Sequence, residues 1–505
     1  MMLRILLVLV MLLAGSSAAR AEWHEVGSPH FVIYANDRPD RIRSFAEMLE
    51  RYDQAFRIYR NLPNTPVAPA GRLTIYVVGS AGEVSRLAGS QSVAGFYTGR
   101  ATGSLAFVPR LTSGGSETLA GQLVLFHEYA HHMMFSIFAQ SAFPAWLVEG
   151  WAEYHATAKV NSDGSVTFGG VANHRAAGIL DNATPAAMLL DSKRAIMPDQ
   201  QMESFYGRSW LLTHYVTFDP ARREQFIRYL RAINEGTSSD EAAKLFGDPR
   251  QLDRELDRYA RGSLVARTVP ADQIRIGTVT ARPLSAGEAA VMQVRIQSDR
   301  GVNEQTAPGV YAAAKKAAAP FPDDPGSQIA LAEAAYDADD YEAALAACER
   351  ALKTDPKAME ALIYKAMAMM AVAARDKDTT PARWSAVRKV IGTANRLDPD
   401  HPEPLILYYR SFVDAQQRPS DLAKDGLVKA FQLAPFDEGL RLNVASMLIA
   451  DSKPAVARTI LLPLANHPHD TGDAKAARDM IAAIDKGEDG TKTPEAKAAG
   501  AKPVD

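Results

Sequence analysis

One short pattern restricts the fold more than any other part of the chain. His127-Glu128-Tyr129-Ala130-His131 places two histidines four residues apart, and Glu149 follows eighteen residues after the second. Residues four apart on a helix lie on one face, so both imidazoles can reach one metal ion while Glu128 points at its water. Two histidines and a carboxylate suit catalytic zinc, which keeps a fourth position for water. The pattern therefore predicts His127, His131 and Glu149 as ligands of one Zn²⁺ per chain.

The same pattern predicts a hydrolytic reaction. Zinc lowers the pKa of its water, and Glu128 can accept the released proton and later pass it to a leaving amine. These steps hydrolyse an amide bond without a covalent intermediate. Glu128 is therefore the predicted catalytic base.

The sequence around Glu149 strengthens this prediction. Residues 146–154 read WLVEGWAEY. Together with HEYAH they resemble the gluzincin metallopeptidases, whose third ligand is a glutamate on a second, downstream helix. In the aminopeptidase branch that helix reads WLxEGxAxY. The resemblance covers roughly residues 90–220 and implies a peptidase MA-like, zincin-like domain. The GxMEN motif, with which aminopeptidases hold a free amino terminus, is absent, so that specificity is not implied.

Two further site residues follow from this resemblance. Glu153 lies one helical turn beyond Glu149, where a carboxylate can accept a hydrogen bond from the distal nitrogen of a ligand histidine. A solvated glutamate is the alternative. The family also places a Tyr or His on a later helix as donor to the developing oxyanion, and Tyr206 is the best local candidate. A structural tyrosine is the alternative there.

Other residues near the motif have less specific interpretations. The imidazole of His132 is turned about 100° from that of His131, so it does not share the metal face. His132, His155, His214 and Tyr215 are more typical of core or surface positions. The segment from Ser104 to Val108 is expected to be an edge strand. It is either an ordinary sheet edge or a place where an extended substrate adds as a strand.

Strand and helix signals alternate through residues 22–267, which predicts an α+β domain with a small mixed sheet. Residues 268–283 are expected to be a connector. The predicted strands lie at 30–34, 73–78, 93–98 and 104–108, and the predicted helices at 40–62, 116–138, after Pro144, and at 203–217, 219–234, 238–246 and 250–262.

From residue 284 the chain becomes alanine-rich and a repeat appears. Asp355-Pro356, Asp398-Pro399, Ala434-Pro435 and His467-Pro468 end successive predicted helix pairs. Residues 284–486 resemble tetratricopeptide repeats; a generic helical array is the alternative, and both predict an all-α solenoid. Such an array would recruit a protein substrate or partner. Residues 487–505 have no apolar face and are expected to be disordered.

Composition and the N-terminus limit partners and location. The chain has 505 residues with 56 basic and 59 acidic side chains, a balance that gives no field for nucleic acid. Residues 1–21 resemble an export signal, which predicts a periplasmic or secreted protein; an uncleaved membrane anchor is the alternative. No later apolar stretch is long enough for a stable membrane span. The single cysteine, Cys348, excludes an intrachain disulfide.

These observations favour an exported zinc metallopeptidase that hydrolyses peptide bonds and whose helical repeats recruit a substrate or partner. The alternative is a peptidase-like binding or scaffold protein without turnover. A repeat scaffold in which HEYAH is accidental is a remote third reading. We also expect that a chain lacking residues 284–505 would still fold as a metal-binding domain.

Overall fold

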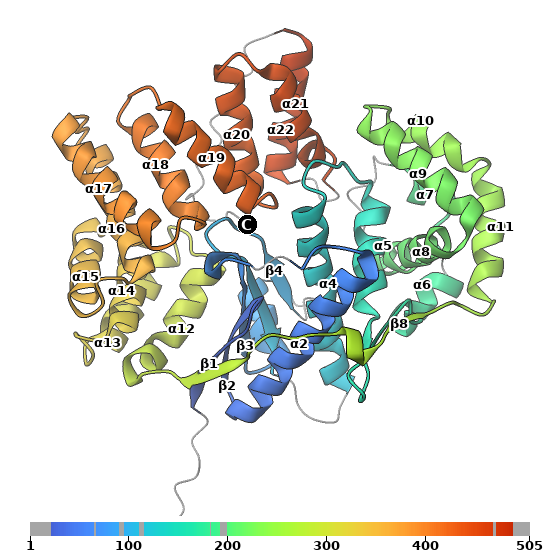
Figure 1. Ribbon diagram of the computed structural model, residues 1–505, viewed down its shortest axis with the longest axis horizontal. Coiled ribbons are helices and arrows are strands. Elements are labelled where there is room, and N and C mark those ends of the chain that lie inside the picture. Colours follow the sequence, from blue (N-terminus) through green and yellow to red (C-terminus); the bar gives the residue numbers. More distant parts are fainter. Residues whose placement is uncertain are drawn as a thin grey trace, which may run out of the picture.

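The computed structural model describes residues 22–64, 67–89, 95–110, 116–181, 183–191, 199–467 and 471–487. Figure 1 shows a mixed α+β part followed by a curved array of helices. The predicted export signal (1–21) and nearly all of the predicted tail (487–505) lie outside the described residues. Among the described helices, none is both long and apolar enough to cross a membrane.

A six-stranded mixed sheet organises the first part of the chain. Its strand order is β4-β5-β3-β2-β1-β9. The three central strands, β2, β3 and β5, are parallel, and the strands beside them pair antiparallel. The strands are β1 (Trp23–Gly27), β2 (Phe31–Asn36), β3 (Leu73–Val78), β4 (Phe96–Thr98), β5 (Leu105–Pro109) and β9 (Thr280–Pro283).

The two faces of this sheet pack against different parts of the chain. Side chains alternate between the faces, as strand geometry requires. Ile33, Ile75 and Ala106 belong to the core that contains α2 (Pro39–Arg60) and α4 (Ser116–Ile137). On the other face, Tyr76 and Phe107 pack with residues of α12 (Ala286–Arg300). The first helix of the alanine-rich region is therefore part of the core of the sheet.

Two sequence predictions need correction here. The expected edge strand, 104–108, is β5, and it is not at the edge because β4 turns back through residues 99–104 and pairs along its outer side. The expected connector, 268–283, contains β8 (Arg267–Val269) and β9, each of which pairs with a distant strand. The edge available for strand addition on that side is β4.

A second small sheet and several helices complete the first part of the chain. A second, three-stranded sheet has the order β6-β7-β8, and a layer of helices packs beside α4. These elements are α3 (Ala81–Ala88), α5 (Ala145–Ala156), β6 (Lys159–Val160), β7 (Val166–Phe168), α6 (Ala176–Leu180), α7 (Ala186–Leu189), α8 (Asp199–Phe218), α9 (Pro220–Asn234), α10 (Ser239–Ala243) and α11 (Pro249–Ala260), with short 3₁₀ turns at Pro69–Gly71, Asn173–Arg175, Lys244–Phe246 and Ala271–Gln273.

Helix pairs form the rest of the described chain, which we call the repeat array (residues 286–485). Three of the predicted helix-pair ends are confirmed, because α15, α17 and α19 each end two residues before a proline; the fourth, at Pro468, lies outside the described residues. The helices are α13 (Ala307–Ala318), α14 (Pro325–Asp337), α15 (Tyr341–Thr354), α16 (Met359–Arg375), α17 (Pro381–Leu397), α18 (Pro402–Asp414), α19 (Asp421–Leu433), α20 (Glu438–Ala450), α21 (Pro454–Ala465) and α22 (Gly472–Asp485).

The repeat array curves back onto the first part of the chain (Figure 1). It begins with α12 on the sheet, and its last helices lie beside the end of α4. There the Arg441 guanidinium donates a hydrogen bond to the carbonyl of Ala139 at 2.9 Å. The array therefore contacts the chain two residues beyond the helix that carries His127 and His131.

Candidate metal centre

Helices α4 and α5 bring the three predicted ligands together. Nε2 of His127 and Nε2 of His131 lie 3.0 Å apart. Oε2 of Glu149 lies 3.4 Å from the first nitrogen and 3.5 Å from the second. Among the described residues, these three form one of two groups of His, Asp and Glu side chains whose ligand atoms converge closely enough to hold an ion.

The arrangement fits a tetrahedral metal ion. Ligand atoms about 2.0–2.2 Å from a tetrahedral zinc lie roughly 3.3–3.5 Å from one another. The observed separations of 3.0, 3.4 and 3.5 Å are close to these values. The donor set of two imidazole nitrogens and one carboxylate oxygen is also one that zinc accepts in catalytic sites. The residues present are therefore compatible with zinc in both geometry and chemistry.

The electrostatics of the group favour a bound cation. Burial opposes ionisation of Glu149, yet the charges of His131 and His127 hold the pKa of this carboxyl well below its usual range. Burial would lower the pKa of His127, but hydrogen bonds to Glu149 and Glu153 raise it to about 10. Two ionised carboxylates thus stabilise positive charge at His127, and a metal ion would satisfy the same need.

A glycine lets the ligand helix approach its neighbour. A Cβ on Gly150 would lie 2.2 Å from Oγ1 of Thr213 and 2.3 Å from the carbonyl oxygen of Ser209, both on α8. Only glycine fits at such a close approach. Because α5 and α8 pack this tightly, Tyr206 on α8 comes next to the ligand residues.

Tyr206, the predicted oxyanion donor, lies beside His127. The centres of its ring and the His127 ring are 6.1 Å apart, in an edge-on arrangement. Burial, followed by the negative charge of Glu149, raises the pKa of the Tyr206 phenol above its ordinary value. The phenol therefore stays protonated and able to donate a hydrogen bond at physiological pH.

Glu153 is buried beside a ligand, not solvated. Its Oε1 lies 3.4 Å from Nδ1 of His127, the ring nitrogen that faces away from the other ligands. His174 and Arg175 also contact this carboxylate, at 2.8 and 2.7 Å. Burial opposes the charge of Glu153, but these three partners hold its pKa well below the usual range. Glu153 therefore occupies the predicted place behind His127.

Sequence reasoning did not identify His174 and Arg175. Both lie on the short Asn173–Arg175 turn. The Arg175 guanidinium also lies over the Tyr206 ring, 4.9 Å from its centre, so it joins Glu153 to Tyr206. The only local signal is a pair of glycines that permit this approach: a Cβ on Gly178 would lie 2.6 Å from the Glu203 carbonyl, and one on Gly207 would lie 3.1 Å from that of Arg175.

Glu128 is half-buried on the same helix as the two histidines. Its negative charge helps to raise the pKa of both Tyr97 and Tyr206, although burial is the larger cause for each. Glu128 is therefore electrostatically coupled to the candidate oxyanion donor and to strand β4. This position is compatible with its predicted role as a base.

The remaining imidazoles have packing roles. His155 is buried and contacts Arg60 and the carbonyl of Trp151. His214 is buried against Tyr259 and the carbonyl of Val265, and burial lowers its pKa to about 4. The Tyr215 hydroxyl bonds to Glu255. His132 differs from them, because it bonds to the Tyr97 hydroxyl of β4 at 2.7 Å.

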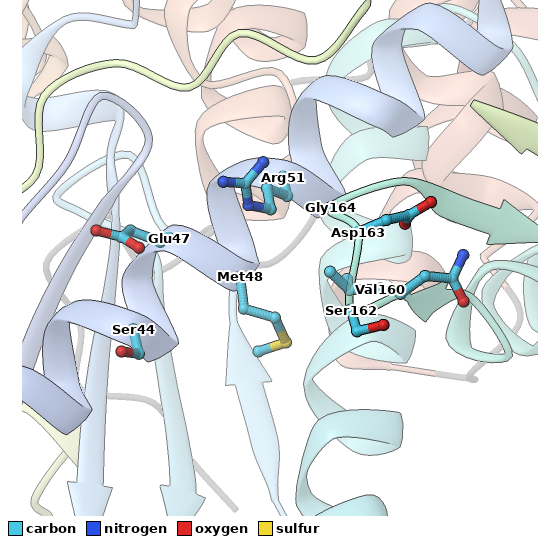
Figure 2. A pocket seen from close by; sticks show the side chains of 9 residues that line it. Ser44, Glu47, Met48, Arg51, Val160, Ser162, Asp163 and Gly164 are labelled. Carbon is cyan, nitrogen blue, oxygen red and sulfur yellow. The ribbon is translucent and has the colours of Figure 1, made fainter. Parts of the chain in front are cut away.

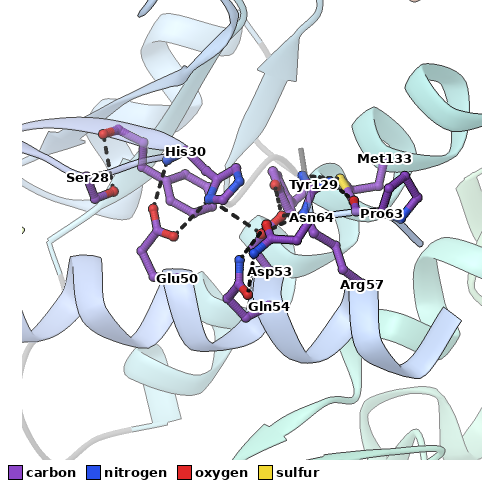
Figure 3. Close-up of polar contacts among 11 residues, drawn as sticks. Ser28, His30, Glu50, Asp53, Gln54, Arg57, Pro63, Asn64, Tyr129 and Met133 are labelled. Carbon is purple, nitrogen blue, oxygen red and sulfur yellow. Dashed lines mark hydrogen bonds and ion pairs between the residues drawn. The ribbon is translucent and has the colours of Figure 1, made fainter. Parts of the chain in front are cut away.

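A buried network of charged and polar side chains connects α2 to the face of α4 opposite the candidate ligands (Figure 3). Nδ1 of His30 lies 2.8 Å from Glu50, and Asp53 accepts hydrogen bonds from Arg57 and from the Tyr129 hydroxyl at 2.7 Å. His30, Glu50 and Asp53 form the second converging group, but Arg57 already supplies a positive charge there. Because Tyr129 projects about 200° round α4 from His127, the network holds the helix on the face opposite the ligands.

A separate polar cavity lies between α2 and the β6–β7 hairpin (Figure 2). Its volume is about 240 Å³. Arg51, Glu47 and Asp163 are among its lining residues, and it contains none of the candidate ligands. It is therefore distinct from the candidate metal centre.

Comparison with known proteins gives little functional information. Residues 123–238 match a family described as a protein of unknown function (DUF1570), and this segment contains every candidate site residue from His127 to Tyr206. No curated protein matches. The crystal structure of TTC0263, a thermophilic TPR protein in Thermus thermophilus, is similar at 16% identity over 39% of this chain and 94% of that chain, with a TM-score of 0.31.

Proposed function

We propose that this protein is a zinc-dependent metallopeptidase whose metal ligands are His127, His131 and Glu149. The convergence of their three ligand atoms, 3.0–3.5 Å apart, is the observation that carries the proposal. Family resemblance of HEYAH and WLVEGWAEY to the gluzincins supports it. Export to the periplasm or medium remains a prediction from residues 1–21.

Each neighbouring residue has a role in the proposed reaction. A bound zinc ion would supply a Lewis acid for the substrate carbonyl and lower the pKa of a water molecule. Glu128 takes the proton from that water and delivers it to the leaving amine. Tyr206, held neutral by burial and by nearby carboxylates, donates a hydrogen bond to the carbonyl oxygen as negative charge develops there.

Glu153 and Arg175 keep these groups in place. Glu153 accepts from Nδ1 of His127 and so fixes the tautomer that presents Nε2 to the metal. Arg175 neutralises part of the Glu153 charge and packs over the Tyr206 ring. Glu153 and Arg175 thus connect the candidate ligand His127 to the proposed oxyanion donor Tyr206.

The proposed substrate is an extended peptide. Strand β4 is one edge of the sheet, and its Tyr97 bonds to His132 on α4, so this edge lies beside the helix that carries the candidate ligands His127 and His131. A peptide that added to β4 as a strand would run alongside α4. The helix pairs of the repeat array are a surface of the kind that binds other proteins, and we propose that they recruit the substrate or a partner.

Glu128→Gln tests the catalytic part of this proposal. The amide keeps the size of the carboxylate but cannot accept a proton, so we expect zinc to be retained and peptide hydrolysis to be lost. Cleaved ends in a proteome digest would be compared between wild type and variant, with Glu47→Gln on α2 as a control. Equal cleavage by wild type and Glu128→Gln would mean that the cleavage does not come from this site. That result would contradict the proposal and favour a binding protein without turnover.

A further inference from the structure

The first helix of the repeat array and the corner before α20 contact the same turn of the sheet. This turn, residues 99–104, joins β4 to β5. Arg100 donates a hydrogen bond to the carbonyl of Asp299 at the end of α12, at 3.0 Å. The backbone N–H of Ala101 donates to Oδ2 of Asp437, just before α20, at 2.7 Å. The array therefore contacts this turn at two points that are far apart in the sequence.

The contact at α20 reaches the junction of β4 and α4. The Phe436 ring centre lies 4.8 Å from that of His132, and a Cβ on Gly99 would lie 3.2 Å from Phe436. His132 in turn bonds to Tyr97 of β4. Phe436 thus packs where the edge strand meets the ligand helix.

A second line of contacts runs from the array to a ligand. The ring of His131 stacks on that of Phe135, one turn further along α4, with centres 6.2 Å apart. Phe135 stacks on His467 of the array, with centres 5.9 Å apart. A ligand histidine is therefore separated from the array by one side chain.

From these contacts we infer that Phe436 and Asp437 are positioning residues for the candidate metal centre. They hold β4 and the His131 turn of α4 in the relative position that the proposed peptidase requires, so the inference rests on the proposed function. Closely packed interfaces have discrete arrangements and do not deform smoothly. A displacement of the α19–α20 corner therefore changes the ligand group and the substrate strand together.

Two pairs of variants separate positioning from general stability. Phe436→Ala removes the ring that packs on His132, and Phe436→Tyr keeps an aromatic ring at this position. The control is Phe412→Ala, which removes a half-buried ring of α18 that contacts Arg388 and Tyr408. Asp437→Asn keeps the oxygen that caps α20 at Leu440 but replaces the one that accepts from Ala101. Asp340→Asn is its match, because Asp340 also caps a helix with one oxygen and accepts from Tyr311 with the other.

The measurements are hydrogen exchange of residues 95–110 and 123–139 and the visible spectrum of the Co²⁺-loaded full-length protein. We expect Phe436→Ala and Asp437→Asn to speed exchange in these segments about fivefold or more, since a loss near 1 kcal/mol has this effect. The cobalt spectrum of Phe436→Ala should change, and Phe436→Tyr should restore it. Phe412→Ala and Asp340→Asn should match wild type in both measurements.

Equal exchange in all the variants would overturn the inference. Failure of the proposed function has a different signature. If wild type binds no Co²⁺, the metal assignment fails, while exchange in the metal-free chain still shows whether Phe436 and Asp437 hold α4 and β4.

Discussion

At the scale of single residues, the candidate centre is a group of charges that burial makes interdependent. Glu149 and Glu153 remain ionised because imidazoles and Arg175 surround them. Tyr206 remains neutral because burial and the same carboxylates raise its pKa. Opposite shifts in neighbouring groups are typical of acid–base sites. Glu149, Glu153 and Tyr206 therefore have the protonation states that the proposed reaction needs.

Tyr206→Phe should lower kcat/KM by roughly 10²–10³, the usual cost of one lost oxyanion donor, while zinc content stays unchanged. The ring is kept, so the packing against Arg175 survives. Steady-state kinetics on a peptide that wild type cleaves would measure the effect, with Tyr215→Phe as control because the Tyr215 hydroxyl bonds to Glu255 instead. Wild-type kinetics in Tyr206→Phe would assign Tyr206 to structure alone.

The sequence predicts the candidate ligands better than it predicts the residues that surround them. His127 and His131 are four residues apart on one helix, so helical periodicity alone places them together. Glu153 could be placed behind the ligands for the same reason. His174 and Arg175 could not, because their turn reaches Glu153 of α5 only through tertiary packing, and the glycines at 178 and 207 do not identify the partners.

At the scale of elements, the close contact between α5 and α8 determines where Tyr206 lies. The space at Gly150 is closed by the Ser209 carbonyl, a backbone atom that cannot move away as a side chain would. The two helices must separate before any side chain can occupy this position. The geometry of the centre therefore depends on the absence of a Cβ at Gly150.

Gly150→Ala should lower the free energy of unfolding by about 3 kcal/mol, at the upper end of the range for overpacking. It should also weaken zinc binding, because Glu149 moves with α5. Gly309→Ala on α13 is the matched control, since a Cβ there would have no atom within 4 Å. That change should be neutral or stabilise by roughly 0.5–1 kcal/mol. Urea denaturation would measure both, and equal effects of the two changes would refute the contact.

Elements with strong local signals were predicted well, and those defined by distant pairing were not. Leu73–Val78 has the predicted bounds of β3, and the long helices agree within a few residues. The sequence does not reveal β1 and β9, because these strands pair with each other across most of the first part of the chain. It also does not show that β4, and not β5, is an edge strand, because strand order depends on tertiary pairing that a single strand does not encode.

At the scale of the whole molecule, the repeat array and the sheet share a core. Met292 and Ile296 of α12 are buried against Tyr76 and Phe107. Removal of the array would expose this apolar face of the sheet to water. The sequence-based expectation that a chain lacking 284–505 folds on its own does not fit this packing.

A chain of residues 22–283 should therefore unfold without a cooperative transition, whereas the full-length protein should unfold cooperatively. Loss of the α12 side chains removes apolar burial of about 1.5–3 kcal/mol for each large residue. Thermal unfolding followed by near-UV circular dichroism would compare the two. A sharp transition in the 22–283 chain would show that α12 is dispensable.

Metal analysis of the purified protein tests whether His127, His131 and Glu149 hold one metal ion. We expect about one zinc per chain in wild type, since three protein ligands define one site. His127→Ala and Glu149→Ala should lose the zinc, whereas His24→Ala, a histidine of β1 remote from the centre, should retain it. Retention of zinc by both ligand variants would show that these residues do not bind the metal.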